Sequence, residues 1–294
     1  KMKKYDIIII GNYTKDTIVS AEGTRYVDGG GFNYGAHVAA LMNLDAAAVT
    51  RLAQADKHVV ENLEKIGLDV FVTFTPQSTF MRLEYPTSNV DERILTVSQN
   101  AGSFKPDQVT ALKSKSFLIN ASVRGEVGID VLTLLKEKNT LIAADVQGYI
   151  RVIRDDGILE YQDWPEMSDV LPYFDILKTD AVEAEALVSE RDIRSAAKKI
   201  SRFGPKEIVL THRDGMLVYA EGKFYEAKFL PEKLVGRSGR GDTCIGAYVA
   251  KRLNAPPAEA TVWAAAVTSL KLEAEGPIKR NVSDVLEIIA KKYQ

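Results

Sequence analysis

The chain of 294 residues is poor in the side chains that build disulfides and zinc sites. It has one cysteine, Cys244, and three histidines, His37, His58 and His212, which lie far apart in the sequence. One cysteine cannot form an internal disulfide, and these residues do not have the spacing of a zinc site. Cys244 stands among small apolar residues, which favours a place in the core over that of a reactive thiol.

Long apolar runs and an excess of one charge are also missing. No apolar stretch of about 18 residues predicts a membrane span, and no charged-then-apolar leader predicts secretion. The net charge is −2 and the pI is near 6.1, so no basic field favours nucleic acid. We expect a cytoplasmic protein that acts on small molecules, with neither nucleic acid nor a membrane as partner.

Short β-branched runs alternate with helical segments along most of the chain. Tyr5–Ile10 is typical of a strand buried on both faces of a parallel sheet. Further strands are expected at residues 46–50, 116–120, 141–145, 176–178, 207–211 and 216–220, and helices at 32–44, 128–137, 181–187, 193–202, 242–253, 258–273 and 283–292. The alternation predicts one α/β domain over residues 1–294, with a doubly wound, mainly parallel sheet and helices on both faces.

The pattern changes between about residues 70 and 98. Three short strands are expected at Val70–Phe74, Thr79–Tyr85 and Arg93–Val97, separated by turn-rich pieces such as residues 86–89. They predict antiparallel hairpins outside the main sheet that form a small β lid, with a further part from residues 12–28. The edge of such a lid is costly to leave uncovered, so a homodimer through the lid is a second expectation.

The segment Gly239-Arg240-Gly241-Asp242 directly precedes an apolar run that is typical of a buried helix. Glycines at a helix start let backbone N–H groups approach an anion, and the helix N-terminus adds partial positive charge. A carboxylate beside bound phosphate is repelled unless it has a task, such as taking the proton of a hydroxyl that attacks phosphorus. The segment indicates phosphoryl transfer to an alcohol, although an acidic residue in a first helical turn is also an ordinary capping feature.

Other polar residues follow the expected strands at their carboxyl ends, where open α/β sheets bind their ligands. They are Asn12, Asp16, Asp145, Gln147, Asp180, Glu183 and Thr211. Each is a weak signal alone, because loops are polar in any case. Their shared position is what the rim of one active site requires.

In order and spacing these elements resemble the PfkB, or ribokinase-like, family of carbohydrate kinases over nearly the whole chain. Gly11-Asn12 with Asp16 resembles the family's N-terminal substrate element, in which the aspartate binds sugar hydroxyls. Gly29-Gly30 with Ala36 is similar to its glycine-pair signature.

The C-terminal half carries the rest of the resemblance. Asp180–Glu183 resembles the Asn-x-x-Glu element, whose glutamate organises magnesium largely through water. Thr211 with Gly215 is similar to the nucleotide-binding turn. Gly239–Asp242 matches the Gly-x-Gly-Asp element that forms the anion hole and carries the catalytic base.

The resemblance implies ATP-dependent phosphorylation of a small sugar or a cyclic polyol, with Mg²⁺ as cofactor; a monovalent-cation requirement stays open. Asp242 is then the base, and Gly239, Arg240 and Gly241 form the anion hole. The implied acceptor-binding residues are Asn12, Asp16, Gly29, Gly30, Asn33, Asp145 and Gln147, the nucleotide-binding residues are Asp180, Thr211, Arg213 and Gly215, and Glu183 is the residue for Mg²⁺.

Several positions depart from the family pattern. Gly236-Arg237 stands where the fuller signature has Asp-Thr, Arg240 where alanine is common, and Arg213 where a glycine is usual. Tyr34-Gly35-Ala36 and residues 145–151 are more similar to a branch that includes inositol and nucleoside kinases than to ribokinase itself. The leading acceptor is therefore an inositol-like polyol or an unphosphorylated sugar.

Other activities stay open beside this one. Within the same family, a nucleoside kinase or a sugar-phosphate kinase is the alternative. In another class, a non-catalytic sugar or nucleotide sensor would use the same fold, because a fold does not fix a function. A dinucleotide-dependent oxidoreductase is disfavoured, since the glycine cluster at residues 29–31 does not follow a strand as Gly-x-Gly-x-x-Gly.

Overall fold

The computed structural model describes residues 3–87 and 93–293. Its largest sheet has nine strands: Lys4–Ile10 (β1), Ala46–Ala53 (β4), Asp69–Thr75 (β5), Lys113–Ile119 (β8), Leu141–Asp145 (β9), Ile176–Asp180 (β12), Glu207–His212 (β13), Gly215–Ala220 (β14) and Lys223–Lys228 (β15). The order is β15-β14-β13-β12-β9-β8-β1-β4-β5. Pairing is parallel from β5 to β13 and antiparallel from β13 to β15. The predicted, mainly parallel sheet is confirmed.

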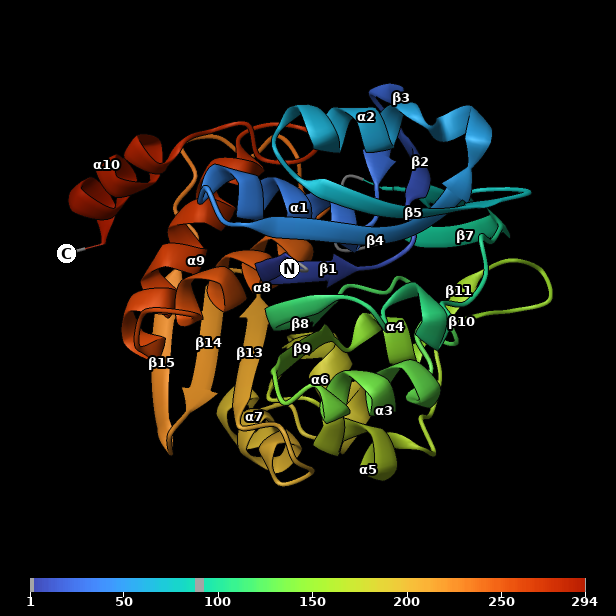
Figure 1. Cartoon of the computed structure of the whole chain (residues 1–294). Coiled ribbons are helices and arrows are strands. Elements are labelled where there is room, and N and C mark those ends of the chain that lie inside the picture. The colour runs from blue at the N-terminus through green and yellow to red at the C-terminus, as the bar shows by residue number, and fades with distance from the viewer. Residues whose placement is uncertain (1–2, 88–92, 294) are drawn as a thin grey trace.

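Helices cover both faces of this sheet, as Figure 1 shows. They are Gly31–Leu41 (α1), His58–Lys65 (α2), Ile129–Glu137 (α3), Gln147–Ile150 (α4), Met167–Val170 (α5), Ala181–Val188 (α6), Ile193–Ser201 (α7), Arg240–Arg252 (α8), Pro257–Leu272 (α9) and Val282–Lys292 (α10). In β1, Ile7 and Ile9 pack with α1, α8 and α9, whereas Ile8 and Ile10 pack with α3, α6 and α7. The continuous isoleucine run therefore serves two cores, because alternate side chains of a strand leave by opposite faces.

A second, four-stranded sheet forms the lid. Its strands are Thr14–Ser20 (β2), Gly23–Gly29 (β3), Thr79–Glu84 (β6) and Ile94–Gln99 (β7), in the order β3-β2-β6-β7. β2–β3 and β6–β7 are antiparallel hairpins, and the two hairpins join through a parallel pair, β2–β6. A short hairpin of Arg151–Ile153 (β10) and Leu159–Tyr161 (β11) is tied to β7, since Val97 N–H donates to the Gly157 carbonyl at 2.8 Å.

The structure corrects the prediction for this region. Val70–Phe74, expected in a hairpin outside the main sheet, lies in β5 and pairs in parallel with β4 as the edge strand of that sheet. Phe71 and Phe74 of β5 are exposed, at 38% and 43%, although they point to opposite faces of the strand, so no residue of this edge strand is fully buried. Periodicity does not tell which sheet such a strand joins. Residues 88–92 of the expected lid lie outside the described residues.

The carboxyl ends of β1, β9, β12 and β13 lie at one edge of the main sheet, where α8 begins. Cys244, in α8, is completely buried with its Sγ 3.6 Å from the Met216 sulfur, as expected of a core residue. Of the described helices, none is long and apolar enough to cross a bilayer.

Candidate active site

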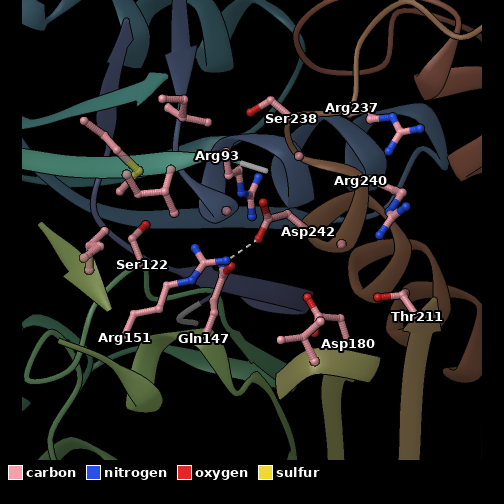
Figure 2. Close-up of a pocket in the computed structure, with 18 of the residues that line it drawn as sticks. Arg93, Ser122, Gln147, Arg151, Asp180, Thr211, Arg237, Ser238, Arg240 and Asp242 are labelled. Atoms are coloured by element: carbon pink, nitrogen blue, oxygen red, sulfur yellow. Dashed lines mark hydrogen bonds between the residues drawn. The ribbon is translucent and has the colours of Figure 1, made fainter. Parts of the chain in front are cut away.

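A pocket of about 610 Å³ lies between the lid and the carboxyl edge of the main sheet. The lid contributes Asp16 from β2 and Leu83 from β6, among others. The sheet contributes the ends of β12 and β13, and the first turn of α8 forms one wall. Figure 2 shows Asp242 in the middle of this space, with Gln147 and Arg151 on one side and Arg237 and Arg240 on the other.

The start of α8 is shaped by glycine. Gly239 is the N-cap residue with φ 76°, a left-handed conformation, and a Cβ there would overlap the ring of Tyr34. Residues 243–250 of the same helix are buried, which fixes the direction of its first turn. The first N–H groups of a helix have no partner within it, and here the Arg240 N–H donates to the Arg237 carbonyl at 3.2 Å. The other N–H groups of this first turn, with the positive partial charge of the helix N-terminus, are the donors offered to the pocket.

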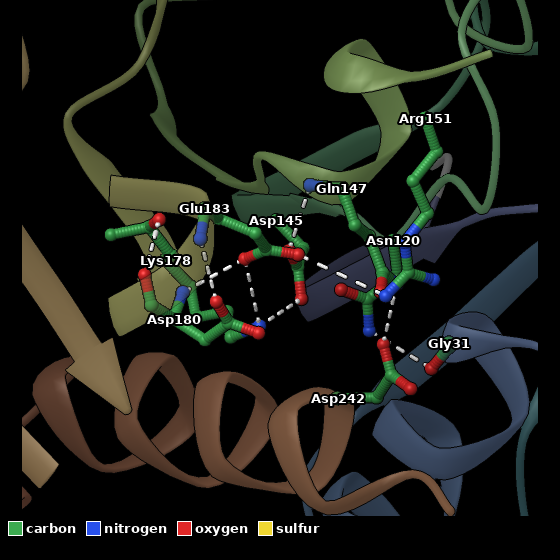
Figure 3. A network of polar contacts seen from close by, with 10 residues as sticks. Gly31, Asn120, Asp145, Gln147, Arg151, Lys178, Asp180, Glu183 and Asp242 are labelled. Atoms are coloured by element: carbon green, nitrogen blue, oxygen red, sulfur yellow. Dashed lines mark hydrogen bonds and ion pairs between the residues drawn. The ribbon is translucent and has the colours of Figure 1, made fainter. Parts of the chain in front are cut away.

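Asp242 is held in place from the acceptor side of the pocket. Its Oδ1 accepts a hydrogen bond from Gln147 Nε2 at 3.0 Å (Figure 3). A Cβ on Gly31 would lie 2.7 Å from the same oxygen, so the first residue of α1 must be small for this approach. Burial raises the pKa of Asp242 above its ordinary value, against the opposing effect of Lys178 and Arg151. A carboxylate of raised pKa is a better proton acceptor at neutral pH.

A buried network of charges lies behind the first turn of α8. Lys178 Nζ is 3.1 Å from Asp145 Oδ2 and 3.6 Å from Glu183 Oε2, and Arg151 Nη2 is 3.8 Å from Glu183 Oε1 (Figure 3). Desolvation lowers the pKa of Lys178, but the facing carboxylates outweigh it, so the net pKa is raised and the ammonium stays charged. A Cβ on Gly241 would lie 2.8 Å from Lys178 Nζ, which places this charge directly beside the Gly239–Gly241 segment.

Asp16 is the carboxylate that the lid presents to the pocket. It is 5% exposed, and burial raises its pKa to about 7. Its Oδ1 has no hydrogen-bond partner among the described residues. Since buried polar atoms normally have one, this oxygen is available to a ligand that carries hydroxyl groups.

The opposite side of the pocket is cationic. Arg213, Arg237 and Arg240 line it and also line an adjoining pocket of about 380 Å³, together with Lys228, Asp214, Phe229, Pro231, Leu234 and Leu272. The Arg240 guanidinium lies 5.9 Å from the centre of the Phe229 ring. Burial lowers the pKa of Arg240, although an arginine remains charged at any physiological pH.

The structure brings many of the predicted site residues together. Those that line the main pocket are Asp16, Gly30, Gln147, Asp180, Thr211, Arg213, Gly239, Arg240, Gly241 and Asp242. Those that do not line it are Asn12, Gly29, Asn33, Asp145, Glu183 and Gly215. For these residues the predicted ligand contacts stay predictions, and the structure gives each a place behind the pocket wall.

Asn12 and Asn33 are two predicted site residues that form hydrogen bonds within the protein instead of lining the pocket. Asn12 donates from its main chain to Glu126 Oε1 at 2.6 Å and from its side chain to the Gly102 carbonyl at 2.8 Å. The side chain of Asn33 donates to the Asp28 carbonyl at 2.9 Å. The two bonds of Asn12 tie the segment after Gly11 to distant loops, and the bond of Asn33 closes the turn around Gly30. An amide in a loop after a strand can bind a ligand or brace the loop, and the sequence does not distinguish the two.

Glu183 does not fit the part of a direct metal ligand. Its carboxylate faces Lys178 and Arg151, and it also accepts a hydrogen bond from the Asp180 main chain at 2.8 Å. No group of three or more metal-ligating side chains occurs among the residues described. The expected role of Glu183 in organising Mg²⁺ through water stays a prediction, and we derive no step through the metal.

Sequence reasoning missed several residues of the site, chiefly Arg93, Ser122, Arg151, Lys178 and Arg237. Lys178 had a usable signal: it is a lysine within the strand Ile176–Asp180, and lysines are almost never fully buried without a partner. Arg93 had none, since it comes to the pocket from the start of a lid strand.

A family model of pfkB family carbohydrate kinases matches residues 4–283. With the ribokinase-like sheet and the Gly-x-Gly-Asp segment at its pocket, this defines a sugar or polyol kinase. The chain belongs to the pfkB family of carbohydrate kinases. A sequence comparison with curated proteins found no match.

Solved structures extend the comparison. A pyrophosphate-dependent kinase in the ribokinase family, complexed with a pyrophosphate analog and myo-inositol, is 31% identical with a TM-score of 0.88, over 96% of this chain and 100% of that one. A pyrophosphate-dependent myo-inositol-1 kinase, converted into a myo-inositol-3 kinase by two substitutions with leucine, is 31% identical with a TM-score of 0.87, over 98% and 100%. Arabidopsis thaliana ribokinase complexed with ribose and ATP is 18% identical with a TM-score of 0.78, over 98% and 99%, and shares the fold.

Proposed function

We propose that the chain transfers a phosphoryl group to a hydroxyl of a cyclic polyol such as an inositol. The observation that carries the proposal is the position of Asp242, which lies in the first turn of α8 directly after Gly239–Gly241 and lines the same pocket as the lid carboxylate Asp16. An acceptor held by Asp16 has its hydroxyl within reach of one carboxylate that can take the proton and of one set of donors that can hold phosphate.

The transfer then runs in one in-line step. The acceptor oxygen attacks phosphorus as its proton passes to the Asp242 carboxylate, and the bond from phosphorus to the bridging oxygen of the donor breaks. The N–H groups of the first α8 turn, with Lys178 beside Gly241, stabilise the charge on the transferred oxygens. Mg²⁺, when it is bound with the donor, neutralises charge on the phosphates.

The lid favours a ring that is apolar on one face and hydroxylated at its rim. Leu83 and Leu95 are directly opposite each other on β6 and β7, and both line the pocket beside Met81. The myo-inositol-1 kinase changes its hydroxyl when an asparagine and a serine become leucines. We infer that the paired leucines of this chain orient the ring and so select the hydroxyl that faces Asp242.

For the donor we propose pyrophosphate. Arg213, Arg237 and Arg240 give the donor side three guanidinium groups, and guanidinium forks suit a compact polyanion. The relatives at 31% identity are described as pyrophosphate-dependent, which supports this choice. ATP is the second candidate, because Phe229, Leu234 and Leu272 offer the adjoining pocket an apolar wall that an adenine could contact.

One assay tests the proposal. Purified protein is given myo-inositol, other inositols, pentoses, hexoses, sugar phosphates or nucleosides, each with MgATP or with magnesium pyrophosphate, and the phosphorylated product is quantified by ³¹P NMR. We expect product from an inositol with pyrophosphate and none from the Asp242→Asn variant. If only nucleosides or sugar phosphates gave product, the proposed acceptor would be wrong. If only ATP supported turnover, the proposed donor would be wrong. No product from any pair would favour the sensor.

We also propose that the chain forms a homodimer through the lid. Tyr26 on the outer strand β3 is 78% exposed and Ile94 on the other outer strand, β7, is 45% exposed, so both edges of the lid carry large apolar side chains. Light scattering on the purified chain, with Tyr26→Ser as the matched variant, distinguishes a dimer that depends on this surface from a monomer.

A further inference from the structure

One fully buried charge takes no part in the transfer described above. Lys271, near the end of α9, is 1% exposed. Its Nζ donates to the carbonyl of Gly236 at 2.9 Å and to that of Ala274 at 3.3 Å. In the part of the chain that the structure describes, its ammonium forms no ion pair with a carboxylate. Burying such a charge is costly, so its position calls for a reason.

The two carbonyls belong to the loops that lead into and lie beside the anion hole. Gly236 is three residues before Gly239, and a Cβ on Gly236 would overlap the Ala274 carbonyl, so the loops are in direct contact. Carbonyl oxygens that converge on one point repel each other, and a cation between them removes that repulsion. The Lys271 ammonium supplies this cation from within the chain.

A second contact joins Lys271 to the same loop. Its Nζ lies 5.6 Å from the centre of the Tyr34 ring, which is within cation–π range. That ring occupies the space where any side chain at residue 239 would lie. The ammonium therefore contacts the loop before α8 directly at the Gly236 carbonyl and indirectly through the α1 ring that packs on Gly239.

We propose that Lys271 is a positioning residue whose ammonium acts as a built-in monovalent cation, fixing the loop before α8 so that its N–H groups face the transferred phosphate. The inference rests on the proposed phosphoryl transfer. It predicts that the chain needs no added potassium, because the internal ammonium takes the place of that cation. The other reading is that Lys271 only caps the carboxyl end of α9, where a cation is favourable in any helix.

The kinetic test compares two variants with different space at the site. Lys271→Ala leaves a cavity beside the carbonyls, and Lys271→Met fills the volume without charge. We expect both to lower kcat about 10²-fold with little change in KM, as for a small misplacement of reacting groups. Ammonium or potassium salts should restore Lys271→Ala and not Lys271→Met, with tetramethylammonium chloride as the ionic-strength control.

Lys251 offers a matched control. It also lies over an aromatic ring, with its Nζ 4.9 Å from the centre of the Trp263 ring, and it pairs with Glu259 away from the pocket. Lys251→Ala should keep the rate of the unaltered chain and show no response to the cation. The unaltered chain itself should turn over equally in potassium and in tetramethylammonium salts.

A structural readout is independent of turnover. Crystals of Lys271→Ala soaked in a thallium(I) salt should show an anomalous peak between the Gly236 and Ala274 carbonyls, and crystals of the unaltered chain should show none. Three results would each overturn the inference. The first is activation of the unaltered chain by potassium, and the second is an undiminished rate in both variants. The third is a loss of rate that no cation restores, together with the absence of a thallium peak. Failure of all turnover would overturn the proposed function, while the thallium result would still decide the cation site.

Discussion

The two sides of the pocket differ in how they are built. The acceptor side presents the carboxylate of Asp16 and the apolar side chains of Met81, Leu83 and Leu95. The donor side presents the guanidinium groups of arginines and the N-terminus of a helix. A neutral polyol needs hydrogen-bond acceptors and an apolar wall, whereas a polyphosphate needs cations. One cavity can therefore bind both substrates, each on its own side. Asp242, which we propose as the base, stands where the two environments meet.

Removing the carboxylate at this boundary should have the largest effect. Asp242→Asn keeps the shape and loses the ability to accept a proton, so we expect kcat to fall about 10²- to 10⁴-fold. Donor affinity, measured by calorimetry, should be unchanged or higher, because a negative charge beside the phosphates is gone. If the variant turned over at the rate of the unaltered chain, Asp242 would not be the base.

A change behind the donor side should affect both rate and stability. Lys178→Met removes the ammonium at Gly241, takes away the ion-pair partner of Asp145 and leaves Glu183 with Arg151 alone. We expect about a 10²- to 10³-fold loss of kcat and about 3–5 kcal/mol of destabilisation, from a buried pair broken on one side.

The control for Lys178 is an exposed pair of the same kind. Lys206, 80% exposed, lies 3.2 Å from Asp175, and Lys206→Met should change the free energy of unfolding by less than about 1 kcal/mol. Urea unfolding of both variants measures the difference. Equal, small effects would mean that the Lys178 network is not the tightly buried arrangement described here.

A change on the acceptor side should redirect the reaction more than slow it. Leu83→Asn combined with Leu95→Ser makes the paired lid position polar, and we expect the ratio of inositol phosphate isomers to shift by about 10-fold or more, as for a pocket contact of 1–3 kcal/mol. NMR of the product measures the ratio. As a control, Ile94→Ser changes an exposed residue on the same strand as Leu95 and should leave the isomer ratio unchanged. If the double variant also left the ratio unchanged, the two leucines would not select the hydroxyl.

The smallest expected effect is the pH dependence of acceptor binding. The pKa of Asp16 is raised to about 7 by burial, so its ionised fraction falls as the pH drops below 7. An ionised carboxylate accepts more hydrogen bonds, and we expect the Kd for the polyol to rise about fivefold from pH 7 to pH 6. Calorimetry without donor separates acceptor binding from phosphoryl transfer. Asp16→Asn should bind the polyol more weakly with no such slope.

The same carboxyl affects stability with the opposite sign. Its pKa is higher in the folded chain than in the unfolded one, so the folded state holds the proton more tightly. The stability that this group contributes is fully present below its unfolded pKa and is lost as the pH rises through about 7. As the pH rises towards 7, acceptor binding therefore improves while the contribution of Asp16 to the free energy of unfolding is lost. In Asp16→Asn, the pH dependence of the Kd and that of the free energy of unfolding should both lose this contribution.

The main sheet and the α8 segment were predictable because their signals are local. Ile7–Ile10 reads as a buried strand from four adjacent residues, and Gly239–Asp242 carries its chemistry within four. Val70–Phe74 could not be placed, because the partner that makes it an edge strand is β4, about twenty residues earlier. Arg93 and Lys271 depend on contacts between distant segments, and only the folded chain brings their charges to the site.

The sole thiol of the chain is chemically silent when the protein is folded. Burial raises the pKa of Cys244 to about 12, so almost no thiolate is present at neutral pH, and the side chain is shielded from solvent as well. A cysteine introduced at an exposed lid residue such as Arg82 would be the one thiol open to a fluorescent or spin label. Movement of the lid on ligand binding can therefore be followed without first removing a native residue.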